Sequence, residues 1–272
     1  MVIATSHGKE KVIAPIFKNE LGIESFVLQS FDTDTFGTFS GEVDRTDDPL
    51  TTARKKCLLA MNAANCDIGI ASEGSFGAHP QLFFVPADDE WLVFIDKKND
   101  LEIVVRELST DTNFNAKTIQ TEDELLAFAE LVKFPSHSII LKKSKDDFDG
   151  MKKGINNLSD LSSVFHQLHK YTNEVYAETD MRAMHNPSRM KVIEQAAIKL
   201  ATKINSHCPN CSTPGFGITN VKQGLPCAWC SAETRSTLSH IYSCAKCDFS
   251  KEEFYPHKKT FEDPMFCDSC NP

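Results

Sequence analysis

The last quarter of the chain reads CPNC at 208–211, CAWC at 227–230, CAKC at 244–247 and CDSC at 267–270. Each Cys-x-x-Cys motif can direct two thiolates at one metal ion from a tight turn, and two motifs complete the tetrahedral shell of structural zinc. The sequence therefore predicts two zinc ions, bound by Cys208, Cys211, Cys227, Cys230, Cys244, Cys247, Cys267 and Cys270. Such closed sites leave no position for a reacting water molecule, so we assign both to structure rather than to catalysis.

The motifs leave their pairing open. Sequential pairing joins the first motif to the second and the third to the fourth, whereas interleaved pairing joins the first to the third and the second to the fourth. We favour sequential pairing because it is simpler, although interleaving would brace the segment across itself. An iron–sulfur cluster also takes four thiolates, but its motifs usually place three cysteines within a few residues.

The charge of this segment disfavours nucleic acid as its partner. The whole chain has a net charge of -9, and residues from 207 onward hold six Lys and Arg against seven Asp and Glu. Two tetrathiolate zinc centres would bring that segment to about -5, whereas binding of phosphate backbones needs a surplus of Lys and Arg. We expect protein contact or support of the preceding domain instead. The aromatic side chains of the segment suit either a protein contact or the core of a very small module: Trp229, Phe249, Phe254, Tyr255 and Phe266.

The 272 residues are 41% hydrophobic and 25% charged, which is typical of a soluble globular protein with one large and one small domain. No stretch has the length of a transmembrane helix and the first residues lack the features of a signal peptide, so we expect a cytoplasmic protein without membrane contact. In a reducing compartment, paired cysteines indicate metal rather than disulfides. The two remaining cysteines, Cys57 and Cys66, are expected to be buried small apolar residues.

Upstream of the cysteines, strand and helix patterns alternate. We expect helices at 9–20, 49–64, 121–132, 158–171 and 187–204, and strands at 2–6, 90–96, 101–108, 138–143 and 175–179. Asp48 and Thr121 are expected to cap the second and third helices. Residues 66–77 are expected to form a strand that breaks into a loop at SEGS. The alternation predicts an α/β domain with a mixed sheet flanked by helices at 1–205, followed by a double zinc-ribbon module at 206–272.

The segment ATSHGKEK at 4–11 is expected to connect the first strand to the first helix. Thr5, His7, Lys9 and Lys11 lie beside the start of that helix, where free backbone N–H groups attract anions. An ordinary loop followed by a solvated basic helix face would show the same pattern.

Four segments, in this order, resemble the inosine/xanthosine triphosphate pyrophosphatase superfamily, which hydrolyses non-standard nucleoside triphosphates to monophosphates. They are ATSHGKEK at 4–11, TTARKKCLLA at 51–60, DIGIASEGSFG at 67–77 and MRAMHNPSRMKVIEQA at 181–196. The resemblance spans residues 1–205 and implies an inosine triphosphatase-like fold. The whole chain, with its SEGS and ETDMRAMHNP segments and its cysteine array, is also similar to an uncharacterised bacterial family with no assigned function.

The resemblance to the pyrophosphatases implies roles for individual residues. It makes Thr5, His7, Lys9, Arg54 and Lys55 phosphate contacts, alongside Lys11 of the same loop. It places Arg182, His185 and Arg189 at the nucleotide. Glu73 would bind Mg²⁺, with Asp96, Glu178 and Asp180 as further carboxylates, so the candidate catalytic residues are Glu73, Lys9 and Asp180. Cations on the phosphates and a carboxylate-bound Mg²⁺ are the requirements of pyrophosphate hydrolysis.

The chain also departs from the superfamily pattern. The opening loop is one residue shorter and lacks the asparagine, and Ala53 and Arg54 stand where acidic residues are frequent in the superfamily. We therefore expect a Mg²⁺-dependent hydrolase of a nucleotide or a related phosphorylated small molecule. The alternative is a non-catalytic ligand-binding or adaptor protein that uses the zinc ribbons for protein contacts.

Overall fold

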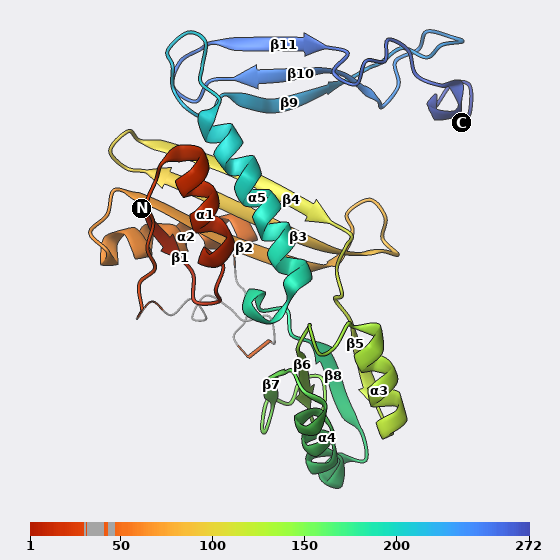
Figure 1. Cartoon of the computed structure of the whole chain (residues 1–272). Helices are drawn as coiled ribbons and strands as arrows, with labels where there is room; N and C mark the ends of the chain where they lie inside the picture. Colours follow the sequence, from red (N-terminus) through yellow and green to blue (C-terminus); the bar gives the residue numbers. More distant parts are fainter. Residues whose placement is uncertain (30, 32–40, 43–46) are drawn as a thin grey trace. The chain divides into compact units, whose positions relative to one another are not determined.

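The computed structural model in Figure 1 describes residues 1–29, 31, 41–42 and 47–272. The chain divides into two compact units, Met1–Ala201 (unit 1) and Thr202–Pro272 (unit 2). The dividing point lies within helix α5 (Pro187–Asn205), a few residues before the predicted end of the α/β domain at 205. Among the described residues, no helix combines the length and the apolar character that crossing a bilayer requires.

The first sheet of unit 1 contains four strands in the order β1-β2-β3-β4: β1 (Val2–Ala4), β2 (Ile68–Ala78), β3 (Pro86–Asp96) and β4 (Leu101–Ser109). Strand β1 runs parallel to β2, whereas β2 with β3 and β3 with β4 are antiparallel pairs. The predicted mixed sheet and the predicted hairpin between β3 and β4 are therefore confirmed.

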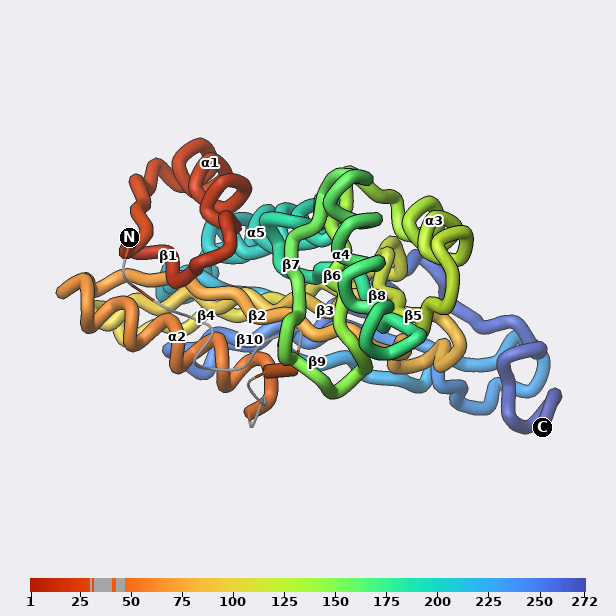
Figure 2. Tube along the Cα trace, turned by 90° about the horizontal axis from the view of Figure 1, so that it is seen from below, coloured from red at the N-terminus to blue at the C-terminus, as the bar shows by residue number. Residues whose placement is uncertain are grey.

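Helices cover both faces of this sheet. Helix α2 (Pro49–Ala63) packs on one face, where Cys57 joins a core that includes Val93. Helix α1 (Glu10–Leu21) packs on the other face, where the ring of Phe17 lies 6.4 Å from the ring of Phe94. Adjacent strand residues point to opposite faces, so Val93 and Phe94 mark the two sides. Helix α5 lies on the α1 side (Figure 2).

The start of α2 follows its predicted signals. The Asp48 side chain accepts a hydrogen bond from the backbone N–H of Thr51 at 3.0 Å, and Pro49 occupies the first helical position. Proline suits this position because the missing N–H would have no helical partner there. Cys57 is fully buried as expected, whereas Cys66 is half-buried, with its Sγ 3.2 Å from the carbonyl oxygen of Ile68.

The predicted loop at SEGS does not form. Strand β2 continues through it to Ala78, in unbroken antiparallel register with β3 from Ile68 opposite Asp96 to Ala78 opposite Pro86. The glycine at 74 serves close packing, since a Cβ atom there would overlap the Glu90 carboxylate and lie 2.7 Å from Nη2 of Arg189. Glycine in a strand interior often marks such a close approach.

Unit 1 also holds a second sheet, where the sequence predicted only one. Its strands have the order β5-β8-β6-β7, all antiparallel: β5 (Ala116–Ile119), β8 (Val175–Thr179), β6 (Ile139–Lys142) and β7 (Lys152–Ile155). Helices α3 (Glu122–Leu131) and α4 (Leu158–Thr172) pack on it around a core that includes Leu125, Leu141 and Phe165. The predicted cap of α3 is confirmed, because the Thr121 hydroxyl accepts a hydrogen bond from the N–H of Glu124. The 3-10 helix η2 (Ala183–His185) leads from β8 into α5.

Unit 2 is built on a three-stranded antiparallel sheet in the order β11-β10-β9: β9 (Gly217–Gln223), β10 (Thr237–Ser243) and β11 (Ser250–Phe254). A short 3-10 helix, η3 (Pro264–Phe266), precedes the last cysteines. The buried apolar residues of unit 2 are few: Ile204, Cys208, Leu225, Cys227 and Cys267. Three of these five are cysteines of the metal motifs, so the apolar core of unit 2 is too small to stabilise it alone.

Candidate metal centres and buried charge cluster

The eight motif cysteines of unit 2 form two groups of four. The proximal group contains Cys208, Cys211, Cys244 and Cys247, and the distal group contains Cys227, Cys230, Cys267 and Cys270. Within each group the candidate ligand atoms all lie within 4.8 Å of one another. Each group can therefore hold one metal ion.

The sulfur spacing fits a tetrahedral ion. In the proximal group, the Sγ atoms of Cys208 and Cys247 are 3.8 Å apart, and those of Cys211 and Cys244 are 3.5 Å apart. The corresponding distances in the distal group are 3.9 and 3.6 Å. A zinc ion with Zn–S bonds of about 2.3 Å places its sulfur ligands roughly 3.8 Å apart, so both groups are consistent with zinc.

The pairing is interleaved, and the sequential pairing that we favoured is wrong. The reason is topological, because one strand lies between each motif and the next. Strand β9 carries the chain from the first motif to the opposite end of the sheet, and the antiparallel β10 returns it, with Ser243 opposite Gly217. The first and third motifs therefore lie at one end, and the second and fourth at the other.

Unit 1 contains a cluster of buried charged side chains on the face of the first sheet that α1 and α5 cover. We call Lys9, Asp88, Glu90 and Arg189 the charge cluster; all four are at most 5% exposed. The Arg189 Nε donates to Oε1 of Glu90 at 2.6 Å, and its Nη1 donates to the carbonyl oxygen of Met181 at 2.5 Å. Its guanidinium also lies over a ring of the same sheet face, 5.1 Å from the centroid of Phe76.

Lys9 brings the opening loop into this cluster. Its Nζ donates to the hydroxyl of Ser72 on β2 at 2.8 Å, which joins the start of α1 to the centre of the sheet. Burial, followed by the positive charge of Arg189, lowers the pKa of Lys9 to about 8. A lysine with such a pKa exchanges its proton near neutral pH, as groups at functional sites often do.

Asp88 is the least compensated member of the charge cluster. It lies opposite Phe76 on β2, is 1% exposed, and neither carboxylate oxygen has a hydrogen-bond partner among the described residues. Burial, followed by the negative charge of Glu90, raises the pKa of Asp88 to about 8. A buried carboxylate without donors is costly, so its presence calls for a bound proton, water molecule or ion.

Glu73 lies on the opposite face of the sheet from this cluster. Its register partner is Trp91, whereas that of Gly74 is Glu90, and neighbouring residues alternate between faces. The Glu73 carboxylate forms a buried ion pair with Lys56 of α2, with Oε2 2.6 Å from Nζ. The negative charge of Glu73, which was predicted to bind metal, is thus balanced by Lys56, for which the sequence predicted no role.

A third set of predicted residues lies where β8 leads into α5. The Asp180 side chain is fully buried and accepts hydrogen bonds from Arg182 Nη2 at 2.6 Å and from the N–H of Gly154 at 3.0 Å. The Nδ1 of His185 lies 3.3 Å from the hydroxyl of Ser138. Asp180, Arg182 and Glu178 line a cavity of about 180 Å³ beside the second sheet.

The remaining predicted contacts do not join the charge cluster. Arg54 pairs with Glu102 and Lys55 pairs with Asp47, and both pairs are solvent-exposed. The side chain of Lys11 is exposed as well. In the opening loop, buried Thr5 accepts a hydrogen bond from the N–H of His7 at 3.2 Å.

Two further predicted carboxylates have other partners. Asp96 accepts hydrogen bonds from Asn99 at the turn between β3 and β4. Glu178 pairs with Lys142 of β6 at 3.1 Å. Neither side chain belongs to a cysteine group or to the charge cluster.

Sequence reasoning missed Asp88 and Glu90. Their signal is the run of three acidic residues in ADDEW, directly before an apolar strand run. The strand predicted from the apolar run begins at 90, so it leaves out Asp88 and has Glu90 only at its first position. Had the strand been extended upstream, its alternation would have placed both carboxylates on the face of Leu92 and Phe94.

The fold and the two cysteine groups define an α/β protein whose C-terminal module has two groups of four cysteines that can each hold a metal ion. A family model described as a domain of unknown function (DUF6671) matches residues 56–272, and the chain belongs to that family. The matched range begins inside α2, so it includes all of unit 2 and the part of unit 1 that follows the opening loop and α1. Comparisons with curated proteins and with solved structures each return no match. The resemblance to the inosine/xanthosine triphosphate pyrophosphatases therefore stays a prediction.

Proposed function

We propose that unit 1 is a hydrolase of a nucleotide or a related phosphorylated small molecule and depends on a divalent cation such as Mg²⁺. The observation that supports this proposal is the charge cluster at the start of α1. Lys9 and Arg189 offer positive charge to a phosphate, and the N-terminus of α1 adds backbone dipoles. Loop residues Thr5 and His7 lie shortly before Lys9 in the same segment.

The donor set suits a hard cation. Mg²⁺ is usually held by one or two carboxylates together with water and substrate phosphates, and the charge cluster contains two buried carboxylates. Glu73 is the other candidate ligand for the cation, on the opposite face of the sheet. A bound divalent cation would supply Lewis-acid chemistry and a water molecule of lowered pKa. The residues themselves would orient the phosphate and exclude bulk solvent.

The test is a screen of the full-length, metal-loaded protein against nucleoside triphosphates with Mg²⁺. We expect pyrophosphate or phosphate release that falls by about 100-fold in Lys9→Ala, because one electrostatic contact to a developing charge commonly contributes that much. Lys11→Ala is the matched control, since Lys11 is an exposed lysine of the same segment. Absence of turnover with every triphosphate would contradict the proposal, and equal turnover by Glu73→Gln would remove Glu73 from it.

We further propose that zinc occupies both cysteine groups and that its role is structural. Each group supplies four thiolates, which closes the tetrahedral shell. Elemental analysis of protein purified without added metal should give about two zinc ions per chain. A value near zero or one, or iron with acid-labile sulfide, would contradict this assignment.

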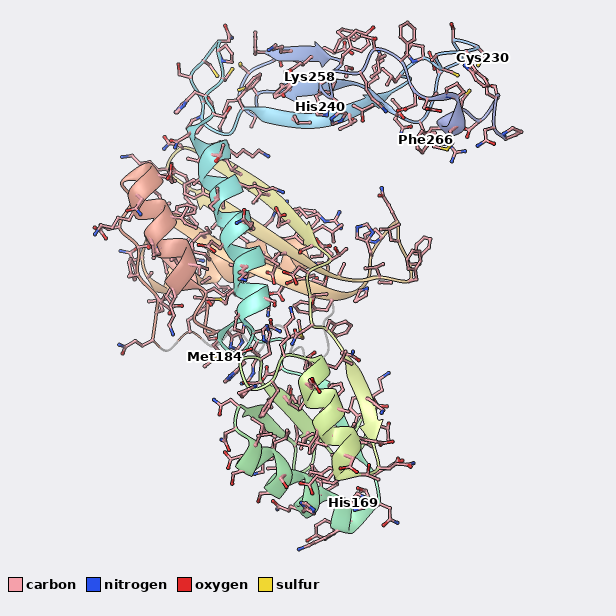
Figure 3. All side chains as sticks on the ribbon, turned by 45° about the vertical axis from the view of Figure 1, so that its right-hand side comes forward. His169, Met184, Cys230, His240, Lys258 and Phe266 are labelled. Carbon is pink, nitrogen blue, oxygen red and sulfur yellow. The ribbon has the colours of Figure 1, made fainter. Side chains whose placement is uncertain are left out.

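A second candidate function is protein contact through unit 2. Apolar side chains next to the distal group are exposed, led by Trp229 at 80% and including Phe261, Met265 and Phe266. Cys230 and Phe266 are labelled at the same end of unit 2 in Figure 3. These aromatics thus do not form a core. Phe249 is different, because it is half-buried and its ring lies 5.7 Å from that of Phe216.

Exposed aromatic side chains are enriched at protein interfaces, which favours an adaptor role for this surface. A partner that binds there should be lost in Trp229→Ser and Phe266→Ser, with metal content unchanged. The control is Phe254→Ser, because Phe254 is exposed on β11 and outside the distal group. Equal loss in all three variants would argue against a specific contact at the distal group.

A further inference from the structure

Three buried carboxylate oxygens of β3 lack donors. They are Oδ1 and Oδ2 of Asp88 and Oε2 of Glu90, and none has a hydrogen-bond partner in the described part of the chain. A buried acceptor left unsatisfied destabilises the folded state, and does so more strongly when it is charged. Three on one strand therefore require protons, water or a cation.

The oxygens lie on one face of the first sheet. Asp88 and Glu90 are two residues apart on β3, so both side chains project from the same sheet face. Gly74, opposite Glu90, removes the side chain that would otherwise fill the space beside it. Nearby, Arg189 Nε is bonded to Oε1 of Glu90 and Lys9 Nζ is bonded to Ser72, so the two basic residues satisfy other oxygens.

We propose that Asp88 and Glu90 bind a hard divalent cation, Mg²⁺ or Mn²⁺, on the α1 side of the sheet. Carboxylate oxygens are the preferred ligands of these ions. This inference rests on the proposed function, because the cation would serve the proposed hydrolysis. It would be bound by carboxylates of β3 rather than by Glu73. Its test does not depend on turnover.

The charge balance predicts how tightly the cation binds. With all groups ionised, Lys9 and Arg189 already offset Asp88 and Glu90, so a divalent ion alone adds two positive charges to a buried site. An anionic ligand would compensate that charge. We therefore expect weak binding of Mn²⁺ alone and binding at least ten-fold tighter with pyrophosphate present.

The experiment is a Mn²⁺ titration of the full-length, zinc-loaded protein, followed by electron paramagnetic resonance with and without pyrophosphate. We expect one Mn²⁺ per chain and at least a ten-fold loss of affinity in Asp88→Asn. Asparagine keeps the shape of the side chain and removes a buried charge, so this variant should fold. The control is Asp89→Asn, whose carboxylate lies on the opposite face and pairs with Arg106 at 2.7 Å.

A second measurement needs no variant. Fe²⁺ bound in place of Mn²⁺ should cleave the backbone near residues 88–90 and 74–76 when hydroxyl radicals are generated at the ion.

Wild-type protein that binds no Mn²⁺ with pyrophosphate, or Asp88→Asn that binds like wild type, would overturn the inference. Loss of binding in Glu73→Gln but not in Asp88→Asn would assign the cation to Glu73.

The outcomes separate the two proposals. Mn²⁺ binding that depends on Asp88, without turnover of any triphosphate, would keep the cation site and reject the hydrolase. Turnover that persists in Asp88→Asn with unchanged Mn²⁺ binding would keep the hydrolase and reject the cation site.

Discussion

At the scale of single residues, unit 1 concentrates its buried charges around the middle of β2. Ser72, Glu73 and Gly74 are consecutive and differ in what they contact. Ser72 accepts from Lys9, Glu73 pairs with Lys56, and Gly74 makes room for Glu90. A buried ion pair contributes little net stability, but removal of one partner leaves a charge in a medium of low dielectric constant. The two faces of the strand are therefore sensitive to different substitutions.

Glu73→Gln should destabilise unit 1 by about 3–5 kcal/mol, because it removes the carboxylate charge opposite the buried Lys56 ammonium. The double variant Lys56→Met with Glu73→Gln should recover most of that loss, since it removes the remaining charge. Urea unfolding of the zinc-loaded proteins, followed by circular dichroism, measures both. A single variant that is as stable as wild type would show that the pair is solvated.

Lys9 should make stability depend on alkaline pH. Its pKa is about 8 in the folded protein and 10.5 in the unfolded chain, so the unfolded chain binds more protons between these values. Stability should therefore rise with pH across that window, by at most about 3 kcal/mol. Thermal unfolding of wild type and Lys9→Met at pH 7.5 and pH 10 measures this, because contributions common to both proteins cancel. A constant difference between the two proteins would place Lys9 in solvent.

At the scale of elements, the predicted helix caps were correct, whereas the predicted end of strand β2 was not. The predicted caps Asp48 and Thr121 start their helices, because a capping side chain acts on N–H groups two or three residues away. The predicted end of β2 was wrong, because Ser, Gly and Glu are typical of loops when they are considered alone. Pairing with β3 overrides that tendency, and this pairing joins residues distant in sequence.

The interleaved metal groups can be tested by pairs of cysteine substitutions. Cys208→Ser with Cys244→Ser damages only the proximal group, so about one zinc ion per chain should remain. Cys208→Ser with Cys227→Ser damages both groups, so zinc should fall toward zero. Sequential pairing predicts the reverse result for the two double variants. Elemental analysis of the purified proteins distinguishes the two patterns.

At the scale of the whole molecule, the two units are stabilised in different ways. Unit 1 has extensive apolar cores on both of its sheets. Unit 2 has five buried apolar residues, three of which are motif cysteines. The metal binding that we propose for unit 2 would be coupled to the folding of that unit.

Removal of metal should therefore unfold unit 2 and leave unit 1 folded. After treatment of the full-length protein with a strong chelator, limited proteolysis should cut within residues 206–272 and leave the helices and strands of unit 1 uncut. Mass spectrometry of the products locates the cuts, and a sample with zinc restored is the control. Protection of unit 2 without metal would contradict the coupling.

Several features were determined by the sequence alone: the α/β class, the helix starts, the hairpin between β3 and β4 and the eight cysteines of the two groups. Each depends on residues close together in the chain or on the chemistry of one residue type. Tertiary structure decided the rest. It divided the strands of unit 1 between two sheets, placed Glu73 and Glu90 on opposite faces, and brought Lys9 to Arg189.

The cysteines show which feature can be predicted from the sequence and which feature needs the folded structure. Their spacing was sufficient to predict two four-thiolate groups, because a Cys-x-x-Cys turn presents its sulfurs locally. Their pairing depends on the direction of β9, β10 and β11, since each strand carries the chain to the other end of the sheet. Strand direction is a property of the folded sheet, and for this reason only the structure could assign the motifs to their partners.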